Sequence, residues 1–130
     1  MPTDTSGSPG PDLSGLRILV VEDTLLIAEL IADELQSFGC EVVGPVAHLQ
    51  KALEMAGTEQ LSGAFLDVNL AGEPCFPIAR KLSQRGVPYV FITGYDDVAA
   101  LPAEYRDMPR VAKPFDPGKL PELANLHFSR

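Results

Sequence analysis

A nearly continuous apolar run ending in two acids lies near the N-terminus, at Leu16-Arg17-Ile18-Leu19-Val20-Val21-Glu22-Asp23. Apolar runs of this kind, rich in branched side chains, are typical of a strand buried on both faces of a parallel sheet. After Thr24, apolar residues recur at a spacing of three to four, which predicts an amphipathic helix closed by Gly39. A buried strand followed directly by a helix predicts an α/β protein.

The same alternation continues along the rest of the chain. Strands are expected at residues 40–46, 64–67, 87–93 and 110–113. Helices are expected at residues 49–56 and 74–84, with a loop or weak helix at 95–107 and a short terminal helix after Phe115. The strand at 40–46 contains glycine and proline, so we expect it at an edge of the sheet. This order predicts a parallel sheet with helices on both faces.

Length and composition indicate one globular domain. The chain has 130 residues, 45% of them hydrophobic and 22% charged, and no apolar run is long enough for a membrane span. The formal net charge of −8 argues against binding to the phosphates of nucleic acids or to anionic lipids. Basic partners or a cation fit this charge better.

The two ends of the chain lead to expectations about domain organisation and location. Residues 1–15 are rich in Pro, Gly, Ser and Thr and lack the features of a signal peptide, so we expect a disordered tail on a cytoplasmic protein. Residues 16–130 are expected to form the whole folded domain. Only fourteen residues follow Asp116, too few for an output domain.

Functional groups gather where the predicted strands end. The first strand ends in Glu22 and Asp23, the third in Asp67, the fourth in Thr93 and the fifth in Lys113. In an open parallel sheet, ligands bind outside the carboxyl ends of the strands. One polar residue at a strand end has an ordinary structural explanation, but four of five strands ending in this way predict a binding site.

Three carboxylates in one crevice repel each other unless a cation lies among them, and their hard oxygen ligands suit Mg²⁺. Lys113 and Thr93 would serve an incoming phosphoryl group, because such a group needs charge neutralisation and hydrogen bonds. A carboxylate can accept that group as an acyl phosphate. Glu22 and Asp23 are adjacent and can hold the ion together, so Asp67, alone on the central strand and facing Thr93 and Lys113, is the expected acceptor.

Four motifs resemble, in content and order, the response-regulator receiver family of two-component signalling. The resemblance runs from Leu16 to about Leu126 and is carried by Ile18-Leu19-Val20-Val21-Glu22-Asp23, Phe65-Leu66-Asp67-Val68-Asn69-Leu70, Phe91-Ile92-Thr93-Gly94 and Val111-Ala112-Lys113-Pro114-Phe115. It implies a flavodoxin-like, doubly wound five-stranded parallel sheet of order 2-1-3-4-5. It also implies that a histidine kinase or a histidine phosphotransfer protein phosphorylates Asp67.

The resemblance assigns the metal ligands. Asp23 and Asp67 would bind Mg²⁺ directly, Asn69 would bind it through its backbone carbonyl, and Glu22 would bind it largely through water.

The resemblance also assigns the groups around the phosphoryl group. Thr93 would move toward that group, and Lys113 would pair with it. The Lys113–Pro114 peptide would be cis, and the small Gly94 would leave an open path to the acceptor.

One position departs from the common pattern. Many receivers carry an aromatic switch residue three positions before the lysine, and here that residue is Arg110. The segment Phe91-Ile92-Thr93-Gly94-Tyr95 is instead similar to the Phe-Ala-Thr-Gly signature of a subgroup found mostly as stand-alone receivers. Tyr95 is then a candidate signalling residue, and the alternative is a partly exposed loop tyrosine.

The expected function is that of a single-domain response regulator, with no enzymatic activity beyond its own phosphorylation and dephosphorylation. It could dock a partner, relay the phosphoryl group or act as a phosphate sink, and it could dimerise through its fourth helix, fifth strand and fifth helix. One alternative is a phosphatase or phosphotransferase with an aspartyl nucleophile, although Asn69 replaces the carboxylate that such enzymes need. The other is a pseudo-receiver that is not phosphorylated.

Overall fold

The computed structural model describes residues 10–94, 101–116 and 118–128. Its main feature is a five-stranded parallel sheet of order β2-β1-β3-β6-β7. The strands are β1 (Arg17–Val21), β2 (Glu41–Val46), β3 (Gly63–Asp67), β6 (Tyr89–Thr93) and β7 (Arg110–Ala112). This order confirms the predicted 2-1-3-4-5 topology, and β2 lies at an edge as expected.

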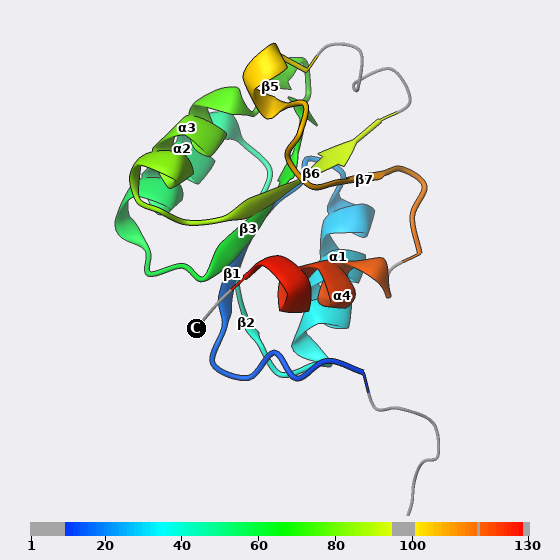
Figure 1. Cartoon of the computed structure of the whole chain (residues 1–130). Helices are drawn as coiled ribbons and strands as arrows, with labels where there is room; N and C mark the ends of the chain where they lie inside the picture. Colours follow the sequence, from blue (N-terminus) through cyan, green and yellow to red (C-terminus); the bar gives the residue numbers. More distant parts are fainter. Residues whose placement is uncertain (1–9, 95–100, 117, 129–130) are drawn as a thin grey trace, which may run out of the picture.

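Helices cover both faces of the sheet. On one face lie α1 (Leu25–Gln36) and α4 (Lys119–His127), and on the other lie α2 (Leu49–Thr58) and α3 (Phe76–Gln84), as Figure 1 shows. Successive side chains of a strand point to opposite faces, so β1 contributes to both apolar layers. Ile18 and Val20 pack on the α1 and α4 side, whereas Leu19 and Val21 pack on the α2 and α3 side. This is why the first strand is apolar almost throughout.

A small hairpin follows the central strand. β4 (Asn69–Leu70) and β5 (Glu73–Pro74) pair antiparallel to each other, with Asn69 opposite Pro74. The helix predicted at residues 74–84 therefore begins at Phe76, two residues later than expected. Pro77, rather than Pro74, lies in its first turn, where the missing N–H is harmless.

Residues 10–15 pack against the domain, which differs from the disordered tail predicted for residues 1–15. The Leu13 side chain is fully buried in the apolar layer between the sheet and helices α1 and α4. Its backbone N–H donates to the Phe38 carbonyl at 2.8 Å. One apolar residue in a stretch rich in Pro, Gly and Ser thus anchors the segment. Residues 1–9 lie outside the described part of the chain.

The segment between β6 and β7 contains little regular structure where it is described. A 3-10 helix, η2, spans Ala103–Tyr105. Tyr105 is buried and stacks on Phe76 of α3, with ring centroids 5.2 Å apart and an interplanar angle of 9°. The expected loop or weak helix at 95–107 agrees with this in residues 101–107. Among the described residues, no helix has the length and apolar character needed to cross a membrane.

Candidate functional site

Three carboxylates meet at the carboxyl ends of β1 and β3. One oxygen each from Glu22, Asp23 and Asp67 lies within 4.8 Å of the others. Glu22 and Asp67 are only 1% and 2% exposed, and Asp23 is half-buried. The adjacent strands of a parallel sheet end at the same edge, which explains why residues 44 positions apart come together.

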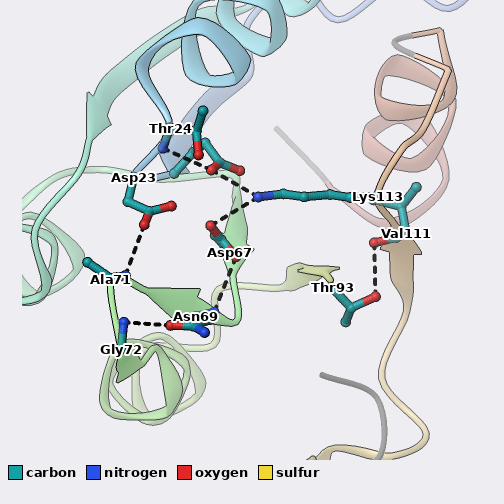
Figure 2. A network of polar contacts seen from close by, with 10 residues as sticks. Asp23, Thr24, Asp67, Asn69, Ala71, Gly72, Thr93, Val111 and Lys113 are labelled. Carbon is teal, nitrogen blue, oxygen red and sulfur yellow. Dashed lines mark hydrogen bonds and ion pairs between the residues drawn. The ribbon is translucent and has the colours of Figure 1, made fainter. Parts of the chain in front are cut away.

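Lys113 reaches this cluster from the end of β7. Its Nζ lies 3.1 Å from Glu22 Oε2 and 3.3 Å from Asp67 Oδ2, as Figure 2 shows for Asp67. Burial alone would lower the pKa of the Lys113 ammonium, but its hydrogen bond to Glu22 and the charge of Asp67 outweigh burial and raise that pKa. Lys113 is therefore a cation held between two buried acids, and the site retains an excess of negative charge.

Burial and the nearby negative charge both act on the Asp67 carboxyl. Burial raises the pKa of the Asp67 carboxyl to about 8, helped by the charge of Glu22 and opposed by Lys113. The pKa of Asp23 is lowered: burial raises it, but hydrogen bonds with Asp67 and the Ala71 N–H outweigh burial. A positive charge placed among these groups would favour the ionised form of Asp67.

The donor set fits a small divalent cation. Glu22 Oε2 accepts hydrogen bonds from Lys113 Nζ and from the Thr24 N–H, whereas the buried Oε1 has no hydrogen-bond partner among the described residues. A buried carboxylate oxygen without a partner is costly unless a cation or water satisfies it. Oxygen ligands from carboxylates are those that Mg²⁺ prefers. Glu22, Asp23 and Asp67 could therefore hold such an ion.

The β4–β5 hairpin holds two of these carboxylates in place. The Ala71 N–H donates to Asp23 Oδ2 at 2.9 Å, and the Asn69 N–H donates to Asp67 Oδ1 at 3.2 Å. Asn69 Oδ1 in turn accepts the Gly72 N–H at 2.7 Å. Figure 2 shows this row of contacts below the carboxylates.

Both central residues of the turn in this hairpin have positive φ. Ala71 has φ 53° and Gly72 has φ 93°, which is the pattern of a type I′ turn. The role of Ala71 was missed at the level of sequence. The sequence signal that could have predicted the turn is Gly72, which lies between the short strands Asn69–Leu70 and Glu73–Pro74.

The Thr93 hydroxyl does not face Asp67 in this structure. Thr93 is fully buried, and its Oγ1 donates to the Val111 carbonyl at 3.4 Å, so the hydroxyl is turned toward β7 (Figure 2). The expectation that Asp67 faces both Lys113 and Thr93 thus agrees with the observed geometry for Lys113 alone.

The remaining predicted residues surround this edge. The Lys113–Pro114 peptide is cis, as the resemblance implied, and Gly94 is half-buried after β6. Arg110 is exposed, and its Nη1 donates to the Arg106 carbonyl at 2.8 Å. Tyr95 lies outside the described residues.

Comparisons with known proteins agree with this geometry. The sequence model of the response regulator receiver domain family matches residues 18–125 of this chain. The chain is similar to the sensory transduction protein LytT of Bacillus subtilis (strain 168), with 32% identity over 104 residues that cover 78% of this chain and 43% of that protein.

Two solved structures are also similar. SdrG from Sphingomonas melonis Fr1 has 38% identity and a TM-score of 0.74, with 85% of this chain and 95% of that chain covered. The receiver domain of the sensor histidine kinase PA1611 from Pseudomonas aeruginosa PAO1, solved with a magnesium ion coordinated in the active site cleft, has 25% identity and a TM-score of 0.68. The match covers 85% of this chain and 94% of that one.

The chain spans about half the length of the curated relatives that it matches, for example 43% of LytT of Bacillus subtilis and 57% of PdtaR of Mycobacterium tuberculosis. The match therefore concerns one domain of these proteins. The fold, the acidic cluster and the family match lead to one conclusion: this chain belongs to the response regulator receiver domain family of two-component signalling.

Proposed function

We propose that this receiver accepts a phosphoryl group on Asp67, with Mg²⁺ held by Glu22, Asp23, Asp67 and the backbone carbonyl of Asn69. The observation that carries the proposal is the position of the Asp67 carboxylate. Its Oδ2 lies 3.3 Å from Lys113 Nζ, and its Oδ1 accepts the Asn69 N–H. The carboxylate is thus oriented at the strand end next to the groups that a phosphoryl group requires.

The chemical step is an in-line displacement on a phosphohistidine of a kinase or phosphotransfer protein. An ionised oxygen of Asp67 attacks phosphorus, the new P–O bond forms as the P–N bond breaks, and the leaving imidazole takes a proton from water. The Lys113 ammonium neutralises charge on the phosphoryl oxygens. Bound Mg²⁺ would supply the further positive charge that the acidic cluster needs.

Thr93 is proposed to report on the phosphoryl group. Its hydroxyl is bonded to the Val111 carbonyl at 3.4 Å, a long distance for an O–H donor. Exchanging this weak bond for a charged phosphoryl oxygen is favourable, because charge-assisted hydrogen bonds are stronger. The change would alter the contact between β6 and β7, and we propose that Gly94, Tyr95 and Pro114 pass it to a partner.

The geometry of Asn69 favours a receiver over a phosphatase with an aspartyl nucleophile. Such an enzyme needs a general acid two residues after the nucleophile. Here the Asn69 side chain instead accepts the Gly72 N–H at 2.7 Å and stabilises the hairpin. The presence of all three acids together with Thr93 and Lys113 likewise favours an active receiver over a pseudo-receiver.

We further propose a cytoplasmic, single-domain regulator of the stand-alone subgroup. Its phosphodonor would be a sensor histidine kinase or a histidine phosphotransfer protein. Output would come from binding a downstream protein, from relay or from a phosphate-sink role, and dimerisation through η2, β7 and α4 could contribute. The acidic net charge of −8 supports protein partners over nucleic acid.

Incubation with Mg²⁺ and acetyl phosphate, followed by intact-protein mass spectrometry, tests the proposal. One added phosphoryl group is expected in the wild-type protein. None is expected in Asp67→Asn, and much less is expected when EDTA replaces Mg²⁺. An unmodified wild type, or equal modification of Asp67→Asn, would contradict the proposal.

A further inference from the structure

A groove of about 600 Å³ lies outside the acidic site, between α2, α3 and the β4–β5 hairpin. Its lining is mainly apolar on the floor and basic at one rim, and includes Leu49, Pro74, Phe76, Pro77, Arg80 and Lys81. Figure 1 shows α2 and α3 side by side, on the face of the sheet opposite α1 and α4. A concave apolar surface with charged groups at its rim is typical of a site that binds a side chain of another molecule.

The charge at the groove contrasts with that of the whole chain. The chain has 18 acidic and 10 basic residues, yet α3 carries Arg80 and Lys81 and has no acidic residue. Both cations are exposed, and neither forms a salt bridge within residues 10–94, 101–116 and 118–128. Glu73 is the acidic residue at the rim, so two cations there face one anion.

The apolar part of the groove is preorganised by contacts on both sides. Phe76 stacks on Tyr105 and meets Phe91 edge-on, with ring centroids 5.2 and 6.1 Å away, so its ring position is fixed. The hairpin that forms the rim is held by the bonds from Ala71 to Asp23 and from Gly72 to Asn69. A surface that needs little ordering loses less entropy when it binds a ligand.

We propose that this α2–α3 groove binds a short acidic segment of a partner protein. An aromatic or aliphatic side chain of the segment enters between Leu49 and Phe76, and neighbouring Asp or Glu residues pair with Arg80 and Lys81. None of the residues proposed to bind Mg²⁺ or the phosphoryl group lines the groove, so the inference does not rest on the proposed function.

Selection of a random peptide library, displayed on phage, against the whole 130-residue chain tests the inference. Enriched peptides are synthesised, and their affinities are measured by fluorescence anisotropy for two double variants. Arg80→Glu/Lys81→Glu reverses the rim charge, and the control Leu30→Glu/Gln36→Glu adds two negative charges at exposed positions of α1, on the opposite face of the sheet. A third variant, Leu49→Glu, places a negative charge on the apolar floor of the groove. A carboxylate in the first turn of α2 is compatible with the helix dipole.

Enriched peptides should combine acidic residues with an apolar anchor and should lose about tenfold or more in affinity for Arg80→Glu/Lys81→Glu and for Leu49→Glu. The control double variant should bind as the wild type does. Failure to enrich any peptide, enrichment of peptides without acidic residues, or unchanged binding to Arg80→Glu/Lys81→Glu would each overturn the inference. Circular dichroism verifies that every variant is folded.

Discussion

Replacement of Asp67 by asparagine should stabilise the protein in the absence of a divalent cation. The Asp67 carboxylate lies within 4.8 Å of oxygens of Glu22 and Asp23 and 3.3 Å from Lys113 Nζ. At an effective dielectric constant of about 20, each repulsion is worth about 3.5 kcal/mol and the attraction about 5 kcal/mol. Repulsion slightly exceeds attraction, and burial of the charge adds to the cost. We expect Asp67→Asn to gain about 1–3 kcal/mol in free energy of unfolding at pH 8.5.

This gain should depend on pH. The pKa of Asp67 is about 8 in the folded protein, against an ordinary value of 3.8 for an aspartate side chain, so the folded state binds this proton more tightly than the unfolded state does. The Asp67 contribution to stability is therefore most favourable below pH 3.8 and is lost as the pH rises to about 8. The Asn variant lacks this titration, so its advantage should be small near pH 5 and should reach its full value above pH 8.

Urea unfolding followed by circular dichroism, with EDTA present at pH 5 and pH 8.5, measures the effect. The matched control is Asp33→Asn, an exposed acid on α1, which should change stability by less than about 0.5 kcal/mol at either pH. Addition of Mg²⁺ should reverse the order at pH 8.5, because the ion stabilises the protein that binds it more tightly. The reasoning would be refuted if cation-free Asp67→Asn were less stable than wild type at pH 8.5, or if the difference did not change with pH.

Two further predictions concern stability. Leu13→Ala should lower the free energy of unfolding by about 2–5 kcal/mol, because it leaves a cavity in the core. The control Leu126→Ala, at a position that is 74% exposed, should have little effect. Urea unfolding measures both variants, and equal effects would mean that residues 10–15 are not anchored. Ala71→Gly should relieve the φ of 53° and raise stability by up to about 1 kcal/mol, whereas Ala71→Val should lower it. Thermal melts of both Ala71 variants measure this, and a stabilising valine would argue against the observed turn.

The topology could be predicted from the sequence because each core strand carries its own local evidence. β1 and β3 are buried on both faces and are therefore apolar in sequence; two acids follow β1 directly, and β3 ends in Asp67. Their shared edge then follows from parallel pairing, which is why Glu22, Asp23 and Asp67 could be expected to meet.

Other features depend on contacts between residues far apart in the sequence, so composition could not predict them. Leu13 is ordered because its side chain packs in the apolar cluster under α1 and α4, although the residues next to it in sequence are typical of a flexible tail. The Ala71 turn depends on a hydrogen bond to Asp23, 48 residues away. The Thr93 hydroxyl donates to the Val111 carbonyl, 18 residues away, and the local sequence around Thr93 does not determine this partner.

The most direct test of the central claim is to locate the phosphoryl group chemically. The protein is phosphorylated with acetyl phosphate and Mg²⁺, reduced with sodium borohydride, which converts an aspartyl phosphate to homoserine, and sequenced by tandem mass spectrometry after proteolysis. Homoserine at position 67, and at no other acidic position, is the predicted result. Homoserine at position 22 or 23, or its absence from a phosphorylated sample, would contradict the assignment of Asp67 as the acceptor.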